Sequence, residues 1–547
     1  MLDTPRRNLK ETFVAAIPPH LRRYAGTGVW SDETIGTLAR AHAQRDPGRV
    51  VYLGEPTAPT YASLLADGEA LARALLDMGL VEGDCIAFQL PNWIEAAVIN
   101  LAAGLAGLVV CPIVPIYRDA EAGWMLRDSR TRVMFVAQMF RNYDFAAMVD
   151  RLRPGLPDLF HVVHVRPTDR SDGLGALLAV GRASQRALPQ VDPDAVKLRL
   201  YTSGTTGAPK AVLHSHNTLN RVALVSAIES GSGSEDITLM PSPVTHISGY
   251  SGALEKPFVT GARVVLMERW DAAEAVALID RHGVTSTVAA TPFLKELCDQ
   301  ARLAGRSLPT FRRFACGGAA VPADLVLAAN AALAQPCAGR VYGSSEVPLV
   351  THSFDPATEG AAAAHTDGRL VDYEVQIVDD TGAACPLGVE GEILARGPSM
   401  FVGYADPHQT EQALTPDGYF RTGDLGTLSA EGAICITGRK KDLIIRGGEN
   451  ISAKEIEDAL LRHPAIAGAA VVAMPHPRLG EGICAFLVGQ DHARPDLAAL
   501  GAFVQAQGLA RQKCPERITW IDALPVTASG KVRKDVLRSL AKDSLTP

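Results

Sequence analysis

The sequence has no excess of positive charge and no paired-cysteine motif. Its 60 Asp and Glu residues outnumber its 53 Lys and Arg residues, which gives a net charge of -7. That balance argues against nucleic-acid binding, because no surplus of cations is left to replace phosphate counterions. The nine cysteines include no C-x-x-C pair and no evident disulfide spacing. We therefore expect neither a zinc site nor a disulfide framework, and a reducing cytoplasm fits this cysteine usage.

A secretory signal and a membrane-spanning run are also missing. Residues 1–11 carry charges where a signal peptide needs an apolar core of about 7–15 residues, so we do not expect secretion. The longest apolar run, 101–111, is shorter than the roughly 20 residues of a spanning helix and contains Gly104 and Gly107. We interpret this run as a buried helix that continues into a buried strand.

The chain is long and its first third alternates between two kinds of pattern. With 547 residues, it is expected to form at least two domains. Alternating helical and strand-like segments predict an α/β fold with parallel strands and covering helices. Residues 165–195 show little periodicity and are predicted to be a surface excursion. The predicted helices are 61–78, 93–106 and one from Asn217 onward, and the predicted strands are 85–90, 108–112, 133–137 and 196–201.

The stretch 201–210 has the composition of a phosphate-binding loop. Residues Thr202 to Ala208 offer only hydroxyls, small side chains and bare backbone, so a polyanion can approach the main-chain N–H groups, and Lys210 adds a cation. The stretch is not a Walker A motif, because Pro209 stands where that motif requires glycine before its lysine. Taken alone, the stretch is equally compatible with an ordinary solvated loop.

The order T-S-G-T-T-G-x-P-K in this stretch resembles the signature of the adenylate-forming superfamily, which includes acyl-CoA synthetases, luciferases and the adenylation domains of peptide synthetases. Further motifs extend the resemblance over most of the chain. The resemblance implies that the loop holds the phosphates of ATP, and that Thr206 is also a catalytic and magnesium-binding residue. The implied ATP-binding residues of the loop are Thr202, Ser203, Gly204, Thr205, Thr206, Gly207 and Lys210.

Two short motifs, 316–322 and 341–347, are interpreted as the adenine site, although each alone would be read as a turn. Paired glycines let a flat ring approach the backbone, and Tyr342 offers an aromatic face. The resemblance implies that Tyr342 stacks on the base, Ser345 contacts the α-phosphate and Glu346 holds Mg²⁺, for which a carboxylate oxygen is a suitable ligand. The superfamily most often has Thr at position 345, and Ser retains the hydroxyl. The other implied nucleotide-binding residues of the two motifs are Gly317, Gly318, Ala319, Gly343 and Ser344.

Three further residues are implied to contact ATP or its substrate. His246, in the motif 241–250, would flank the acyl pocket and is a catalytic candidate, although a lone histidine is more often structural. Asp424 would accept hydrogen bonds from both ribose hydroxyls, which suits a carboxylate. Arg439 would contact the nucleotide.

The segment 436–451 and the C-terminal motif 525–535 contain the residues that the resemblance assigns to the hinge, to the coenzyme A channel and to adenylation. Lys441 falls on the superfamily's hinge position, and Gly447 and Gly448 resemble the loop that forms the pantetheine channel for coenzyme A. Lys531 would bridge the carboxylate and the α-phosphate during adenylation, where one cation offsets charge on both reacting groups. Without this context, Lys531 would be interpreted as a solvated lysine.

The chain is expected to divide into an N-terminal AMP-binding and acyl-binding domain, 1–440, and a small mobile α+β domain, 441–547. A capping box at Ser452 and Glu455, with Ile451 and Ile456 as a hydrophobic staple, predicts that the small domain's first helix begins at Ala453. Its predicted helices are 453–463 and 497–510, and its predicted strands are 467–474, 484–488 and 518–521.

The expected function is an ATP-dependent carboxylate:CoA ligase that uses ATP, Mg²⁺ and coenzyme A and works through an acyl-AMP. Resemblance of 115–119 and 140–145 to bacterial ligases suggests a medium-chain, alicyclic or aryl acid. The alternatives are a carrier-loading adenylation domain, a luciferase-like monooxygenase and a catalytically dead nucleotide sensor. A sensor has little use for Lys531, and the length without a carrier domain favours a stand-alone ligase. We expect a cytoplasmic monomer or homodimer.

Overall fold

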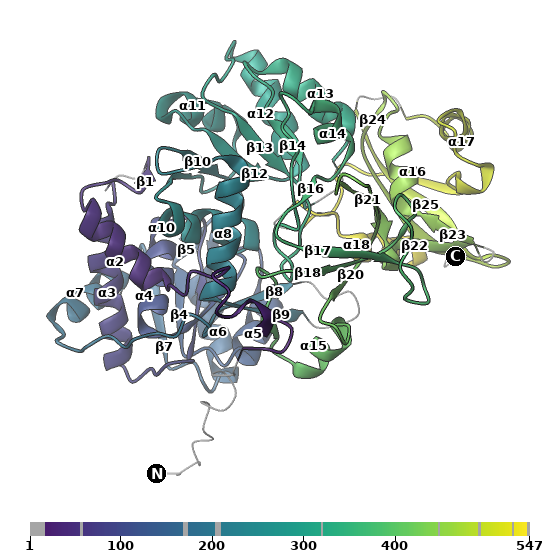
Figure 1. The fold of residues 1–547 in the computed structure, drawn as a ribbon. Coiled ribbons are helices and arrows are strands. Elements are labelled where there is room, and N and C mark those ends of the chain that lie inside the picture. Colours follow the sequence, from purple (N-terminus) through teal and green to yellow (C-terminus); the bar gives the residue numbers. More distant parts are fainter. Residues whose placement is uncertain are drawn as a thin grey trace.

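The computed structural model describes residues 17–54, 58–167, 173–202, 209–318, 321–446, 449–490, 494–527 and 530–543. Two sheets rich in parallel strands, with helices packed against them, form the larger part of the molecule (Figure 1). The first sheet has the order β19-β9-β8-β3-β2-β4-β7, and its last five strands run parallel. Its strands are Gly403–Tyr404, Lys210–Ser215, Val196–Thr202, Val109–Pro112, Cys85–Gln89, Val133–Ala137 and His161–Val165.

The second sheet is parallel throughout, in the order β1-β11-β10-β12-β13-β14. Its strands are Tyr52–Leu53, Arg263–Leu266, Ile237–Met240, Ser286–Ala289, Arg313–Cys316 and Ala338–Arg340. The alternation seen in the sequence therefore predicted the α/β class correctly. The helices around the two sheets are α2 (Ile35–Arg45), α3 (Tyr61–Asp77), α4 (Ile94–Ala106), α5 (Asp119–Asp128), α6 (Phe145–Leu152), α7 (Leu174–Ala183), α8 (His216–Ser230), α10 (Lys256–Thr260), α11 (Ala272–His282), α12 (Thr291–Leu303), α13 (Ala323–Ala332) and α14 (Gly360–His365).

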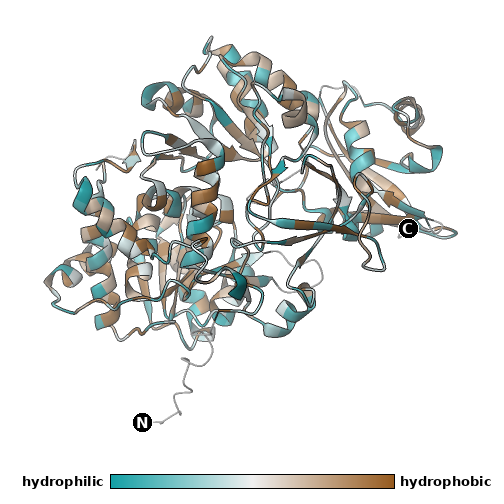
Figure 2. Cartoon of the chain, in the orientation of Figure 1, coloured by the Kyte–Doolittle hydropathy of each residue, from teal (hydrophilic) through white to brown (hydrophobic). Residues whose placement is uncertain are grey.

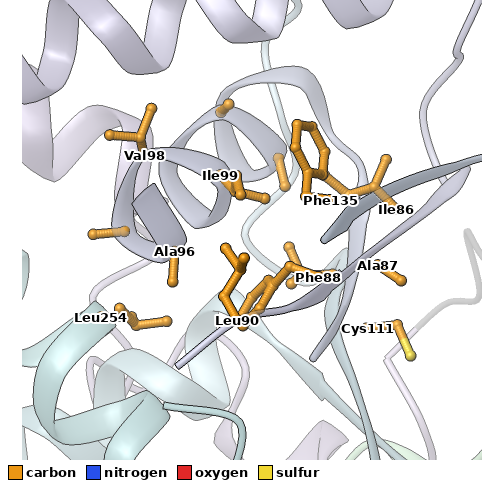
Figure 3. Packing of buried hydrophobic residues seen from close by; sticks show 14 of the residues in the cluster. Ile86, Ala87, Phe88, Leu90, Ala96, Val98, Ile99, Cys111, Phe135 and Leu254 are labelled. Atoms are coloured by element: carbon orange, nitrogen blue, oxygen red, sulfur yellow. The ribbon is translucent and has the colours of Figure 1, made fainter. Parts of the chain in front are cut away.

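The helix α4 packs on the strands β2 and β3 in the larger core. Figure 3 shows Ile99 of the helix on the side that faces Phe88 of β2 and Phe135 of β4, whereas Val98 lies on the opposite side of the helix from Ile86. Each of these side chains is at least nine-tenths buried, and burial of such a side chain contributes about 1.5–3 kcal/mol. Figure 2 shows the same distribution over the whole molecule, with brown strands inside and teal residues on the outer helical faces. The apolar run 101–111 is thus a buried helix followed by a buried strand, as predicted.

Two segments differ from the sequence-based expectations. Within 165–195, the structure has the helix α7, and its Gly181 lies so close to α3 that a Cβ would meet the Ala70 carbonyl oxygen at 1.8 Å. This short helix was not predicted, because the Pro, Gly and Arg residues that flank it leave little periodicity in the sequence. The strand β9 was also missed. It pairs antiparallel with β8, so the phosphate-loop stretch joins the two strands of a hairpin, rather than joining a strand directly to a helix.

A third, antiparallel sheet in the order β17-β18-β20-β21 leads to the C-terminal region. Its strands are Glu374–Val378, Gly391–Arg396, Phe420–Leu428 and Ile434–Arg439, and the helix α15 (Pro407–Ala413) precedes β20. Figure 1 shows the C-terminal elements, in yellow-green and yellow, beside this sheet. Among the described residues, no helix is long and apolar enough to cross a membrane.

The C-terminal elements form a sheet and core of their own. The sheet has the order β23-β22-β25-β24, with β26 beside β25, and α16 begins at Ala453 where Ser452 accepts a hydrogen bond from the Glu455 backbone N–H. The predicted helix start, the burial of the staple residues and the strands are confirmed, although α16 and α17 end three and four residues earlier than expected. Only the Ser452 half of the predicted capping box is present, because the Glu455 carboxylate accepts hydrogen bonds from Lys513. The strands are β22 (Leu443–Arg446), β23 (Glu449–Ser452), β24 (Ile466–His476), β25 (Gly480–Gly489) and β26 (Arg517–Trp520), and the helices are α16 (Ala453–Leu460), α17 (Leu497–Ala506) and α18 (Lys534–Asp543).

Candidate active site

A cavity of about 180 Å³ opens at the carboxyl ends of the parallel strands β12, β13 and β14. Ligands of open α/β sheets bind at this end of the strands, because the loops that follow the strands converge there. Several of the predicted site residues come together in its wall although they lie far apart in the sequence. They are His246, Gly317, Gly318, Tyr342, Gly343, Ser344, Ser345 and Lys531.

The two ends of the phosphate-loop stretch are held by strand pairing. Thr202 is the last residue of β8 and pairs with Lys210, the first residue of β9. The Lys210 ammonium lies 4.8 Å from the centre of the Tyr404 ring, a cation–π distance. The predicted phosphate-binding residues Ser203, Gly204, Thr205, Thr206 and Gly207 lie outside the described residues.

The predicted ribose site is built where β14 ends opposite β20 and β21. The Tyr342 hydroxyl donates a 2.8 Å hydrogen bond to one oxygen of Asp424, and Arg439 Nε pairs with the other at 2.7 Å. Asp424 and Arg439 are cross-strand partners in the β20–β21 register, which explains their proximity. A carboxylate has about four acceptor sites, so Asp424 retains capacity for a diol beside these two partners. Burial, followed by the Asp424 charge, raises the pKa of Tyr342 well above its usual value.

Glycine is required where β13 ends. A Cβ on Gly317 would lie 2.5 Å from the Val341 carbonyl oxygen, and Gly318 has a φ of +81°, which L side chains rarely adopt. A Cβ on Gly318 would lie 3.7 Å from Lys531 Cε, so the lysine side chain runs directly past this turn. The third predicted adenine-site residue, Ala319, lies outside the described residues.

The Glu346 carboxylate is oriented by two hydroxyl groups. Ser344 Oγ donates to one oxygen at 2.9 Å, and the Tyr404 hydroxyl donates to the other at 2.8 Å. The next residue upstream, Ser345, is held through its carbonyl oxygen, which accepts a 2.7 Å hydrogen bond from His214 Nε2. Burial lowers the pKa of His214 to about 4, so its ring is neutral near pH 7.

Lys531 brings the C-terminal region into the cavity. Its backbone N–H donates to Thr527 Oγ1 at 3.1 Å, which fixes the turn that presents its side chain. Burial and the Arg439 cation lower the pKa of Lys531, while the carboxylates of Asp424 and Glu346 oppose that shift. Burial, followed by the Lys531 cation, lowers the pKa of His246 to about 3. His246 is therefore a neutral polar group beside a cation.

The predicted hinge residue lies in a single 3-10 turn, Lys440–Asp442, between β21 and β22. Arg538 of α18 donates to the Lys441 carbonyl oxygen at 3.4 Å and forms an ion pair with Asp442. Burial and the neighbouring Arg439 lower the pKa of Lys441. The predicted channel residues Gly447 and Gly448 lie outside the described residues.

Sequence reasoning missed Tyr404 and His214. Tyr404 comes from the edge strand β19, which pairs with β9 and so lies beside the phosphate-loop hairpin. His214 comes from β9 itself and is fully buried. Neither belongs to a motif that the sequence alone identified, and only the strand pairing shows their relation to Glu346 and Ser345.

The sequence matches the profile of the AMP-binding enzyme family over residues 39–405, and that of the AMP-binding enzyme C-terminal domain over 455–531. The chain belongs to the AMP-binding enzyme family. This AMP-binding enzyme is 35% identical over 540 residues to a medium-chain fatty-acid–CoA ligase of Escherichia coli K12, a match that covers 95% of this chain and 93% of the relative. The protein itself is an AMP-forming acyl-CoA synthetase, as its sequence motifs implied.

A second relative widens the range of acceptors within the family. The AMP-binding enzyme is 32% identical over 532 residues to the salicyl-AMP ligase / salicyl-S-ArCP synthetase of Mycobacterium tuberculosis, covering 93% of this chain and 91% of the relative. Its fold is similar to that of ATP-bound MatB from Rhodopseudomonas palustris, with a TM-score of 0.83, 27% identity, and coverage of 94% of this chain and 100% of that one. ATP and coenzyme A are therefore its co-substrates.

Proposed function

We propose that the protein joins a medium-chain, alicyclic or aryl carboxylic acid to coenzyme A, with acyl-AMP and pyrophosphate formed in a first step and AMP released in a second. The observation that carries this proposal is the position of Lys531, which reaches from the C-terminal region into the cavity lined by His246, Tyr342 and Ser345. That cation stands where an acid and the α-phosphate of ATP would meet.

The two-step route makes chemical sense because a free carboxylate is a poor electrophile, whereas a mixed anhydride is a good one. In the first step, the carboxylate oxygen attacks the α-phosphorus and pyrophosphate leaves. Lys531 would offset the negative charge on the attacking group and on the reacting phosphoryl group, an electrostatic contribution that is large in a buried site. In the second step, the thiolate of coenzyme A attacks the acyl carbon and AMP leaves. The neutral His246 would border the acyl group without adding a second cation.

The residues around Glu346 fit a nucleotide-bound magnesium ion. Mg²⁺ commonly takes one or two carboxylates together with phosphate oxygens and waters. The Glu346 carboxylate is already oriented by Ser344 and Tyr404, and Thr206 is a second proposed ligand. Within the described part of the chain, no group of three or more His, Cys, Asp and Glu could hold a metal ion alone, which fits an ion that arrives with ATP. When bound, the ion would neutralise phosphate charge.

The acid is inferred from the cavity. Its wall contains apolar groups such as Val222, Ala223, Val288 and Phe293. A cavity of about 180 Å³ is of the order of the ~150 Å³ apolar cavity that accommodates benzene in an engineered protein. Each buried methylene contributes about 0.8 kcal/mol, so a compact apolar body is expected to bind far better than acetate. The E. coli relative's name gives medium-chain fatty acids, and that of the mycobacterial relative gives an aryl acid.

The domain boundary and hinge are part of the same proposal. We place the boundary at 440/441, because all strands from Leu443 onward belong to one separate sheet. Rotation at Lys441 would withdraw Lys531 and let the 447–448 segment form the channel for coenzyme A. The nine free cysteines support a reducing compartment, for which the cytoplasm remains our prediction.

Carrier loading is the second candidate, because the mycobacterial relative's name includes that activity. A non-catalytic nucleotide sensor is disfavoured by the geometry of Lys531. The test is pyrophosphate release with acetate, octanoate, cyclohexanecarboxylate and benzoate. Any of the last three should exceed acetate in kcat/KM by well over tenfold. Acetate as the best substrate would overturn the substrate class, and no pyrophosphate with any acid would favour the sensor.

A further inference from the structure

The cavity has a second polar end that the adenylation chemistry does not use. Lys256, the first residue of α10, lies in its wall and is 7% exposed. The neighbouring wall residues come from α8 (Ser226), β13 (Ala315) and β15 (His352 of Thr351–His352). None of these belongs to a nucleotide motif.

Two pairs of polar groups mark the two ends of the cavity. At one end, the Lys531 cation contributes to the lowered pKa of His246. At the other, the Lys256 cation contributes to the pKa of His352, which burial lowers to about 4. Arg313 Nε donates to the Ser230 carbonyl oxygen at 2.9 Å, so the C-terminal end of α8 lies at the start of β13. The turn at Gly318, which Lys531 runs past, follows the other end of this strand.

The Lys256 ammonium has no hydrogen-bond acceptor or ion-pair partner within the part of the chain that the structure describes. The carboxylate that raises its pKa is Asp236, which is already paired with Arg312. An unpaired ammonium that faces an otherwise largely apolar cavity is costly, and a ligand that supplies an acceptor relieves that cost.

His352 adds an acceptor beside this donor. Its Nδ1 is 3.2 Å from the Ser353 carbonyl oxygen, and since a carbonyl only accepts, the neutral ring carries its proton on Nδ1. Nε2 is then an acceptor. The far end therefore offers one cationic donor and one neutral acceptor.

We propose that Lys256 is a specificity-determining residue that binds an oxygen acceptor, a ketone or a second carboxylate, at the end of the acid remote from the reacting carboxylate. This inference rests on the proposed function, since it assumes that an acid occupies the cavity. The preferred acid then has a compact apolar body between two oxygenated ends. An acid without the distal oxygen is disfavoured because it leaves the buried ammonium unpaired, the situation in which enzymes discriminate most strongly.

The test compares matched acids by pyrophosphate release with the full-length protein. The pairs are cyclohexanecarboxylate with 4-oxocyclohexanecarboxylate, and octanoate with 7-oxooctanoate and octanedioate. In the wild type, an oxygenated acid should exceed its parent in kcat/KM by at least tenfold in one of the two series. Lys256→Met, which keeps the side-chain length without the charge, should reverse that preference. The exposed Lys295, paired with Asp299 at 2.9 Å, supplies the control Lys295→Met, which should change neither ratio.

A second variant distinguishes a distal ketone from a distal carboxylate, and it keeps the test informative if Lys256→Met does not fold. Lys256→Gln retains an N–H donor without charge, so it should keep a preference for the ketone and lose one for octanedioate. Parent acids preferred by the wild type in both series, or a preference that both Lys256 variants leave unchanged, would overturn the inference while leaving the ligase proposal intact. Absence of pyrophosphate with every acid would overturn both.

Discussion

The Tyr404 hydroxyl donates a 2.8 Å hydrogen bond to the Glu346 carboxylate, across 58 residues of sequence. The same ring lies under the Lys210 ammonium. One side chain thus links the phosphate-loop hairpin to the proposed magnesium ligand. Burial and the Glu346 charge raise the pKa of Tyr404, so it remains a hydrogen-bond donor throughout the working pH range.

Removing this hydroxyl should weaken the use of MgATP. A hydrogen bond to a charged group contributes about 1.5–3 kcal/mol, so Tyr404→Phe should lower kcat/KM for ATP by roughly tenfold or more and raise the Mg²⁺ concentration needed for half-maximal rate. Tyr373→Phe is the control, because the buried Tyr373 hydroxyl has no partner among the described residues. Equal effects of the two substitutions would contradict the role assigned to Tyr404.

Restricting the hinge should separate the two half-reactions. Proline fixes φ and lacks an N–H, so Lys441→Pro should hinder rotation between the two conformations. Because the structure already has Lys531 in the cavity, pyrophosphate formation should survive and thioester formation should fall. Stopped-flow measurement of each step gives the answer, and two unchanged rates would mean that the pivot lies elsewhere.

The preference for an oxygenated acid should depend on pH. Burial lowers the pKa of Lys256 to about 8, opposed by Asp236. The ammonium is present below that value and is lost above it, whereas His352 is already neutral above about pH 5. The ratio of kcat/KM for octanedioate over octanoate should be level near pH 7 and fall from pH 7 to 9, because the neutral amine keeps an N–H donor but no longer offsets the charge of the distal carboxylate. Taking a ratio cancels the titration of Lys531. A ratio that stays level to pH 9 in the wild type would refute this dependence.

The sequence predicted the parts of the site that act through the backbone or through local motifs. Gly317, Gly318 and Tyr342 were assigned to the site from paired glycines, an aromatic face and the family resemblance, and in the structure they follow the short strands β13 and β14. The capping of α16 by Ser452 was likewise a local property. The proximity of Asp424 and Arg439 came only from the resemblance, and the structure explains it by strand pairing.

The parts that could not be predicted depend on contacts between distant segments. Tyr404 reaches Glu346 because an edge strand of two residues pairs with β9, and two residues give no periodic signal. In the sequence, Lys256 is a single charged residue before a proline, and nothing in that pattern indicates that its side chain is buried. Its burial follows from the packing of α10 against α8 and α2, which no local pattern encodes.

We predict that Lys531 is required in only one of the two steps. If its cation offsets charge where the acid meets ATP, Lys531→Ala should lower the rate of acyl-AMP formation by roughly a hundredfold or more. Transfer to coenzyme A from supplied acyl-AMP should be largely intact. The exposed Lys542, on the next helix, gives the control Lys542→Ala, for which both steps should be normal. Equal loss of both half-reactions in Lys531→Ala would show that the lysine has a different role.

The most direct test of the ligase is a single incubation of the wild-type protein with ATP, Mg²⁺ and an acid that releases pyrophosphate, followed by addition of free coenzyme A. Acyl-AMP, AMP and acyl-CoA are measured together by chromatography. The ligase function predicts that enzyme-bound acyl-AMP forms before coenzyme A is added. After the addition, one acyl-CoA and one AMP should appear for each pyrophosphate, with no carrier protein present. Acyl-AMP that forms but yields no thioester over long incubation would contradict this and leave carrier loading in its place.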